Sequence, residues 1–401
     1  MGKIFLLFIG WRVFLLVTLS FAIGILPLQM NFLGGGLSNY LKHPYLWAWI
    51  NFDGEHYLSI ARQGYQPLTF FYFPLYPFLI RFLANIFGQD FVNLAISGLV
   101  ISNLSFLIGI IGLAKLIRLD YSEKIVKLAI LILLFFPTSF YFGSYYTESI
   151  FFASVIWSFY FARKGRWFWA GFLGGLSSLT RIIGLAIFPA LLVEFFIVSD
   201  PARRFLKLRL SKFLPAFYLL MIPLGLSFYM FYLKRETGDP LEFFHSVSIF
   251  GEQRVPGFVL LPQVFYRYVF KVLPNIDYSY FPVVFTTWME TITAVSFGGL
   301  GLLGILGGFV LRLHSGSMRR IRIPKIRLSY VTYLVIGYLI PTLSGSFSSM
   351  PRYVLVLFPA YIIMAMFLSR VPKIAANLIF FLLIISLFIV TSLFTRGYWV
   401  S

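Results

Sequence analysis

Long apolar runs separated by short polar connections dominate all 401 residues of the chain. A helix needs about 20 mostly apolar residues to cross the hydrocarbon core of a bilayer. Runs of this kind predict about 11 spanning helices, within a range of about 10 to 13. The predicted spans are 4–26, 91–114, 128–144, 146–162, 167–180, 182–198, 213–233, 287–311, 328–343, 353–368 and 374–394.

Lysine and arginine gather in a subset of the connections, and such clusters mark the cytoplasmic side of a membrane protein. The basic clusters fall within 115–127, 163–166, 203–212, 312–327 and 370–373. With these clusters inside, two long connections lie outside, the first at 27–90 and the second at 234–286. Within the first, segment 70–88 carries Arg81 and prolines. We therefore expect it to form an interfacial helix and not a span.

Acidic residues are unevenly distributed under this topology. Most of the 14 acidic residues map to the outer side, among them Asp53, Glu148 and Glu290. Acidic residues contribute little to orientation, so this asymmetry does not merely repeat the charge rule. A functional acidic cavity and ordinary solvation of loops both explain it.

Composition fixes the class of protein. The chain is 59% hydrophobic and 12% charged, which excludes a soluble globular protein. Because helices satisfy their own backbone polar groups in lipid, the expected fold is an all-α polytopic membrane protein, and 1–401 is treated as one membrane domain. The net charge of +19 indicates cytoplasmic loops and contact with anionic membrane lipids, not nucleic acid. Cysteine is absent, which excludes disulfides and thiolate-bound zinc.

Asp53 is the first candidate catalytic residue. It lies in the segment Asn51 to Tyr57, between the aromatic ring of Phe52 and the flexible Gly54. A partly buried carboxylate of this kind can remove the proton of an attacking hydroxyl group. A simple turn aspartate is the alternative, since Asp-Gly pairs favour turns.

Glu55 and His56 follow Asp53 and have two interpretations. All three side chains can bind a divalent cation through carboxylate oxygen and imidazole nitrogen. No second segment rich in such ligands supports a metal site. We therefore expect no metal and no other cofactor, and we predict that Glu55 and His56 help to bind substrate.

Three further ionisable residues interrupt apolar sequence at the predicted outer edge: Glu148, Arg181 and Arg352. An ionisable group in such a position indicates a functional site. Both arginines are suited to bind a phosphate or pyrophosphate. The alternatives are a helix-capping role for Glu148 and a snorkelling position for the arginines at the lipid headgroups.

Ordered motifs between about residues 49 and 360 resemble the PIG-V family of mannosyltransferases. The matching elements are Phe52-Asp53-Gly54, His56-Tyr57-Leu58, Gly64-Tyr65, Phe73-Pro74-Leu75-Tyr76-Pro77, Tyr146-Thr147-Glu148-Ser149, Thr180-Arg181 with Gly184, and Arg352-Tyr353. Two positions depart from the family pattern. Phe52 replaces a tryptophan and Tyr72 replaces a phenylalanine.

The resemblance implies a glycosyltransferase of the GT-C fold that inverts the anomeric centre and uses a catalytic aspartate in the first external loop, here Asp53. It also implies a polyprenyl-phosphate sugar donor, such as dolichyl-phosphate mannose, and a lipid-linked or glycan acceptor. We assign substrate binding to the following residues: Glu55, His56, Tyr57, Tyr76, Glu148, Arg181, Arg352 and Tyr353.

The compact loops are typical of a prokaryotic plasma-membrane protein, so the acceptor need not be the glycosylphosphatidylinositol anchor of eukaryotic members. The expected function is transfer of a hexose, with mannose favoured, on the outer face of the membrane. A lipid or polysaccharide transporter and a non-catalytic scaffold are the alternatives. A transporter would place acids near the bilayer midplane, commonly within internal repeats, and the sequence shows no such repeat.

Overall fold

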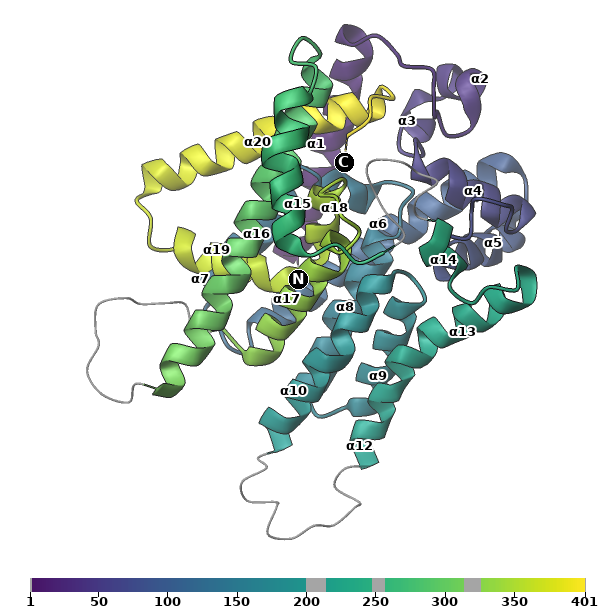
Figure 1. Cartoon of the computed structure of the whole chain (residues 1–401). Coiled ribbons are helices and arrows are strands. Elements are labelled where there is room, and N and C mark those ends of the chain that lie inside the picture. The colour runs from purple at the N-terminus through teal and green to yellow at the C-terminus, as the bar shows by residue number, and fades with distance from the viewer. Residues whose placement is uncertain (1, 200–213, 247–256, 314–325, 401) are drawn as a thin grey trace.

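The computed structural model describes residues 2–199, 214–246, 257–313 and 326–400, with helices as the only regular secondary structure in these ranges (Figure 1). The first half contains α1 (Gly2–Ile25), α2 (Gly36–Lys42), α3 (Pro44–Trp47), α4 (Asp53–Gln63), α5 (Leu75–Phe87), α6 (Phe91–Ile117), α7 (Glu123–Phe135), α8 (Glu148–Arg163), α9 (Trp167–Ser178) and α10 (Ile187–Ser199). The second half contains α12 (Leu214–Phe217), α13 (Met221–Glu236), α14 (Glu242–His245), α15 (Leu261–Arg267), α16 (Phe281–Leu313), α17 (Leu328–Thr342), α18 (Met350–Tyr353), α19 (Phe358–Leu368) and α20 (Lys373–Thr395).

The predicted all-α architecture with several apolar spans is confirmed. Five helical stretches among the described residues are long and apolar enough to cross a membrane: Gly2–Ile25, Phe91–Ile117, Leu214–Glu236, Phe281–Gly307 and Lys373–Thr395. A sixth is added if Met350–Val356 and Phe358–Leu368, which meet at a bend of 85°, form one broken span. The remaining apolar helices are shorter, so the total of about 11 spans stays a prediction.

Two predicted spans are interrupted in the structure. The segment 128–144 is helical only to Phe135, because Pro137 cannot continue the helix, and a short 3₁₀ turn follows at Ser139–Gly143. The segment 182–198 begins with a 3₁₀ turn at Ile182–Ala186 before α10 starts. These breaks bring polar residues to the ends of α8 and α9.

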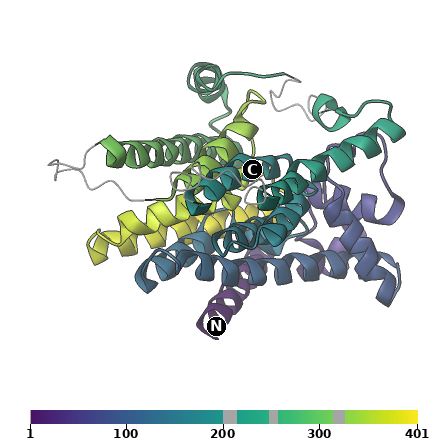
Figure 2. The ribbon, with the colours of Figure 1, turned by 90° about the horizontal axis from the view of Figure 1, so that it is seen from below.

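The first long connection folds into the four short helices α2 to α5. Helix α5 has 13 residues and is about 20 Å long, too short for a hydrocarbon core of about 30 Å. It packs on α6 and exposes Phe78, Phe82 and Ile86 on its other side. Figures 1 and 2 both place these purple and blue helices on one side of the bundle and the green α16 on the other.

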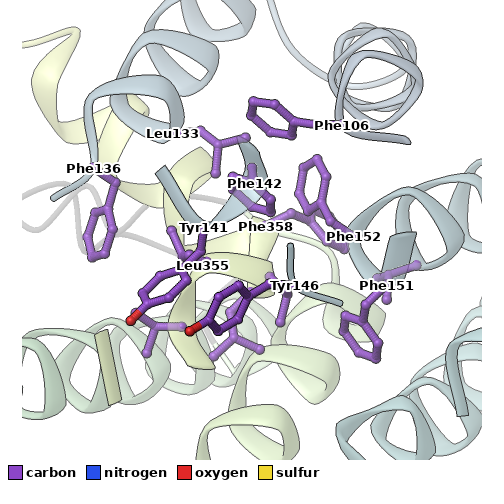
Figure 3. Packing of buried hydrophobic residues seen from close by; sticks show 14 of the residues in the cluster. Phe106, Leu133, Phe136, Tyr141, Phe142, Tyr146, Phe151, Phe152, Leu355 and Phe358 are labelled. Atoms are coloured by element: carbon purple, nitrogen blue, oxygen red, sulfur yellow. The ribbon is translucent and has the colours of Figure 1, made fainter. Parts of the chain in front are cut away.

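Aromatic side chains fill the centre of the bundle. Phe106 of α6 stacks on Phe142 with ring centroids 4.2 Å apart. Tyr141 and Tyr146 lie next to each other, 4.8 Å between ring centroids, with their hydroxyl groups on the same side (Figure 3). A Cβ atom at Gly98 would come within 2.1 Å of the Tyr145 ring, so glycine allows α6 to approach this aromatic turn closely.

Charged residues occupy both ends of α8, which are about 24 Å apart along a helix of 16 residues. Glu148 begins the helix and Arg163 ends it. At the Arg163 end, Asp120, Glu194 and Arg327 form further ion pairs. This end therefore joins residues of separate basic clusters, Arg163 and Arg327, through Glu194. The cluster at 203–212 and positions 314–325 of another lie outside the described residues.

Candidate active site

Four ionisable side chains from distant parts of the sequence meet at the other end of α8. The guanidinium group of Arg352 lies 2.5 Å from Asp53 Oδ2, and its Nε lies 3.2 Å from Glu148 Oε1. Arg181 donates a hydrogen bond to the same Glu148 oxygen. The cluster contains two carboxylates and two guanidinium groups, so its formal charge is balanced.

The backbone positions these groups at element ends. Asp53 and Glu148 each start a helix, where the helix dipole stabilises a negative charge. Arg181 has extended backbone geometry between α9 and the 3₁₀ turn that follows. Arg352 lies in the short helix α18, which Ser349 precedes with a left-handed backbone. The N–H of Ser349 donates to Glu290 Oε1 at 3.1 Å and fixes this turn to α16.

Burial makes the pairing of these charges important. Glu148 is 0% exposed, and Arg181 and Arg352 are 9% and 8% exposed. An unpaired charge at such a depth would be strongly destabilising. The rings of Tyr141 and Tyr146 lie 5.6 Å and 5.5 Å from the Arg352 guanidinium carbon and add cation–π contacts. These two tyrosines stand side by side in Figure 3.

Asp53 is held in its ionised form. Burial alone raises the pKa of this carboxyl group, but the charge and hydrogen bond of Arg352 lower it more, and the result is a pKa below the ordinary value. His56 also lowers the pKa by its charge. The hydroxyl group of Tyr72 donates a hydrogen bond to Asp53 Oδ1 at 3.1 Å and acts in the same direction.

Two cavities meet at this cluster and share Asp53, Phe71, Tyr72 and Arg352 in their walls. The first, here called the polar cavity, has a volume of about 420 Å³. Its other wall residues are Gln29, Asn31, Phe32, Phe52, His56, Tyr280, Ser349, Gly397, Tyr398 and Trp399.

The second, here called the apolar cavity, has a volume of about 550 Å³. Its wall is mainly aliphatic and aromatic and includes Ile182, Leu226, Met230, Phe243 and Phe258. Arg181 lies in this wall and not in that of the polar cavity. The walls of the two cavities therefore differ in their polar and apolar side chains, although both include the carboxylate of Asp53.

The predicted substrate-binding residues occupy different positions around these cavities. His56 lines the polar cavity and stacks on Tyr72 with ring centroids 4.9 Å apart. Tyr57 and Tyr353 line the apolar cavity. Glu148 is fully buried, lines neither cavity, and contacts both arginines from behind.

Glu55 and Tyr76, like Glu148, are predicted substrate-binding residues that line neither cavity. Glu55 is exposed, because two residues along a helix correspond to a rotation of about 200° away from Asp53. Tyr76 is fully buried and bonds to Gly98 O at 3.0 Å and Ser102 Oγ at 2.8 Å. Its role in this geometry is to hold α5 against α6.

The sequence did not single out Tyr72, Tyr141 or Trp399 for a functional role. Aromatic residues make up 20% of the chain, so an individual ring carries little signal. Tyr72 was visible only as a departure from the PIG-V pattern.

The described residues contain no group of three or more histidine, aspartate or glutamate side chains arranged to hold a metal ion, and Asp53, Glu55 and His56 do not converge as such a set.

Residues 67–227 match a family model described as Dolichyl-phosphate-mannose-protein mannosyltransferase. This segment includes Glu148 and Arg181, but neither Asp53 nor Arg352. Among curated proteins, no sequence matches the chain.

Two solved structures of ArnT from Cupriavidus metallidurans resemble the chain. The apo form has 15% sequence identity and a TM-score of 0.47, and the match covers 93% of this chain and 60% of the ArnT chain. The form bound to undecaprenyl phosphate has 14% identity and a TM-score of 0.39, and the match covers 98% of this chain and 77% of that one. In the first comparison, the chain thus spans 60% of the length of ArnT.

Proposed function

We propose that this protein is a membrane glycosyltransferase that moves a hexose from a polyprenyl-phosphate carrier to an acceptor hydroxyl group with inversion. The observation that carries the proposal is the meeting of a polar and an apolar cavity at a carboxylate paired with arginine. A donor with a lipid tail and an acceptor with a polar hydroxyl need such a junction. The match of residues 67–227 to a mannosyltransferase family model supports this class of reaction.

The apolar cavity fits the donor. Its aromatic and aliphatic wall can bury the first isoprene units of the carrier by the hydrophobic effect. Arg181 and Arg352 lie in the same wall, where guanidinium groups can bind the phosphate through charge-assisted hydrogen bonds. The lipid tail and the phosphate of one molecule therefore find matching surfaces in a single cavity.

Asp53 serves as the general base for the acceptor. Its carboxylate takes the proton of the acceptor hydroxyl as the hydroxyl oxygen bonds to the anomeric carbon. The bond between this carbon and the phosphate oxygen breaks on the opposite face, and its electron pair leaves with the phosphate. The arginines offset the charge that develops on this leaving group.

Donor binding also changes the basicity of Asp53. With Arg352 at 2.5 Å, the carboxylate is ionised but weakly basic. A bound phosphate competes with Asp53 and Glu148 for the Arg352 guanidinium and weakens its effect on the carboxylate. The pKa of Asp53 then rises towards the value favoured by burial, so the base is strongest when the donor is present.

Mannose is the hexose that the PIG-V resemblance favours, and a lipid-linked or glycan molecule is the acceptor. The charge rule for loops and the same resemblance favour an active site on the outer face of the membrane. The motifs that support this assignment are those around Asp53, Glu148, Arg181 and Arg352.

The test uses purified protein in liposomes with polyprenyl-phosphate [¹⁴C]mannose and candidate glycan and glycolipid acceptors. The proposal expects labelled product with the anomeric configuration opposite to that of the donor, as determined by NMR. Label that crosses the bilayer on its carrier without transfer to any acceptor would instead support a lipid transporter. Product with retained configuration would contradict the role of Asp53 as a base in a single displacement.

A further inference from the structure

We infer that the polar cavity is a binding subsite for an uncharged saccharide, and that Trp399 is the aromatic surface on which the sugar stacks. The link to transfer rests on the proposed function, because the saccharide would be the acceptor. The subsite itself rests on the cavity wall, which combines exposed aromatic rings, side-chain amides and few free charges.

The segment after α20 is held firmly against the first long connection. Gln29 N–H donates to Arg396 O at 2.9 Å, and the Arg396 Nε donates to Leu26 O at 3.0 Å. Tyr141 OH donates to Val400 O at 2.7 Å on the other side of Trp399. Residues 396–400 are thus bonded on both sides of the tryptophan, and its ring is preorganised.

A close approach at Gly397 is required for this arrangement. Gly397 has a φ of +78°, and a Cβ atom there would lie 2.5 Å from Gln29 O. Only glycine satisfies both conditions. The chain therefore turns sharply against residue 29 and directs the next residues towards the polar cavity.

The aromatic rings form a continuous wall. Trp399 packs edge to face on Phe52, with ring centroids 5.2 Å apart, and Phe32 stacks on the same Phe52 at 6.1 Å. Trp399 remains 42% exposed, Phe32 64% and Tyr280 44%. The electron-rich face of such a ring attracts the polarised C–H groups of a sugar. Rings left exposed inside a polar cavity are suited to this contact.

The polar groups of the wall match sugar hydroxyls. Gln29 and Asn31 are exposed, and each amide can both donate and accept hydrogen bonds, as a hydroxyl group requires. The ionisable wall residues other than tyrosine are Asp53, His56 and Arg352, and the aspartate and arginine are paired with each other. The opposite formal charges of Asp53 and Arg352 cancel in this wall, and the further guanidinium of Arg181 lies in the apolar cavity, so the polar cavity favours an uncharged ligand.

Backbone strain also concentrates around this cavity. The described residues contain four non-glycine residues with positive φ, namely Phe32, Phe52, Leu68 and Ser349. Three of them line the polar cavity. Such conformations are unfavourable and persist only where the surrounding structure fixes them. Because Phe52 directly precedes Asp53, the strained backbone holds the stacking wall and the carboxylate in one fixed relation.

The test measures binding of α-1,2-mannobiose to the full-length protein in lipid nanodiscs, by saturation-transfer NMR and competition. We expect Trp399→Ala to weaken binding about tenfold, because one stacking surface is lost. Trp399→Phe retains an aromatic face and should stay within about threefold of wild type. Trp169→Ala, which removes a 48% exposed ring on α9, is the matched control and should bind as wild type does. Thermal unfolding of each variant confirms that it is folded.

Unchanged mannobiose binding by Trp399→Ala would overturn the inference. So would a wild-type protein that binds acetyl-Gly-Ser-Gly-amide and no sugar, since the acceptor would then be a peptide. If mannobiose binds through Trp399 while wild-type protein transfers no labelled mannose, the subsite stands and the proposed function fails. If transfer occurs and Trp399→Ala leaves the KM for a mannoside acceptor unchanged, the subsite fails and the proposed function stands.

Discussion

Arg352 and Asp53 are separated by 299 positions in the sequence, yet their side chains form an ion pair of 2.5 Å. This pair lies in the wall of both cavities, and Glu148 contacts the same guanidinium from the buried side. The pair thus links the group that would accept a proton to the group that would bind a phosphate. Substitutions at Arg352, Tyr72 and Arg181 separate these two roles.

Arg352→Gln should raise the pKa of Asp53, because burial then acts without the opposing charge. Transfer requires the ionised carboxylate, so the acidic limb of the kcat/KM profile should move to higher pH. The measurement is the pH dependence of transfer for both proteins. Arg62→Gln, an exposed change on α4, is the control and should leave the limb in place. An unshifted limb in Arg352→Gln would show that the ion pair does not set the basicity of Asp53.

The same pair makes stability depend on pH. The pKa of Asp53 is lower in the folded protein than its unfolded value of about 3.9. Its contribution is therefore present above about pH 4 and is lost as the pH falls through the folded pKa. Thermal unfolding between pH 3 and pH 7 should show a smaller acid-induced loss for Arg352→Gln than for wild type. Equal losses in the two proteins would contradict this assignment.

Tyr72→Phe removes the hydroxyl group that donates to Asp53 at 3.1 Å and keeps the ring that stacks on His56. Since this hydrogen bond lowers the pKa of Asp53, the variant should have a more basic carboxylate. We expect the acidic limb to move upward by less than about one pH unit and turnover to change by less than about tenfold. A shift towards lower pH would show that Tyr72 acts in another way.

Arg181→Gln should weaken binding of the donor and leave binding of the acceptor unchanged, because Arg181 lines only the apolar cavity. Loss of a charged hydrogen bond to phosphate corresponds to about 1.5–3 kcal/mol, or roughly 10- to 150-fold in donor KM. Inhibition by free polyprenyl phosphate should weaken by a similar factor. Arg181→Lys should recover part of the loss. If Arg181→Gln raised only the KM for the acceptor, Arg181 would not bind the donor phosphate.

The charged cluster at the far end of α8 should support folding and not catalysis. Glu194 is 0% exposed, lies 2.8 Å from Arg327 and 3.3 Å from Arg163, and accepts a hydrogen bond from Ser329. Glu194→Gln breaks these buried pairs and should destabilise the protein by about 3–5 kcal/mol, with donor KM unchanged. Glu123→Gln, in an exposed pair with Arg118, should leave the melting temperature unchanged. If Glu194→Gln protein that is fully folded showed a changed KM for the donor, the cluster would have a role in catalysis and not only in folding.

The sequence indicated the ionisable members of the cluster for a simple physical reason. Charged groups are rare in this chain and unfavourable in lipid, so Asp53, Glu148, Arg181 and Arg352 stood out individually. The prediction that these groups belong to one end of the molecule followed from the charge rule applied to loops. Their proximity in the structure supports the same grouping, whereas their chemical roles stay predictions.

Other parts of the site depend on contacts that a single sequence does not contain. Nothing near residues 396–400 indicates that they pack against residue 29, because hydrogen bonds between backbone groups leave no side-chain signal. The outward direction of Glu55 depends on Asp53 being the first residue of α4, and helix starts are poorly defined by sequence. The break after Phe135 has a sequence signal in Pro137, whereas the 3₁₀ turn at Ile182–Ala186 lies within a continuous apolar run.

The most direct test of the account is the single-turnover rate of Asp53→Asn at saturating polyprenyl-phosphate mannose. Asn keeps the size of the side chain and removes the proton acceptor, so the rate should fall by at least about 10²- to 10⁴-fold while the donor still binds. Asp90→Asn, the same change at an exposed helix cap that asparagine also satisfies, is the matched control. A rate for folded Asp53→Asn within about tenfold of wild type would contradict general-base catalysis by Asp53.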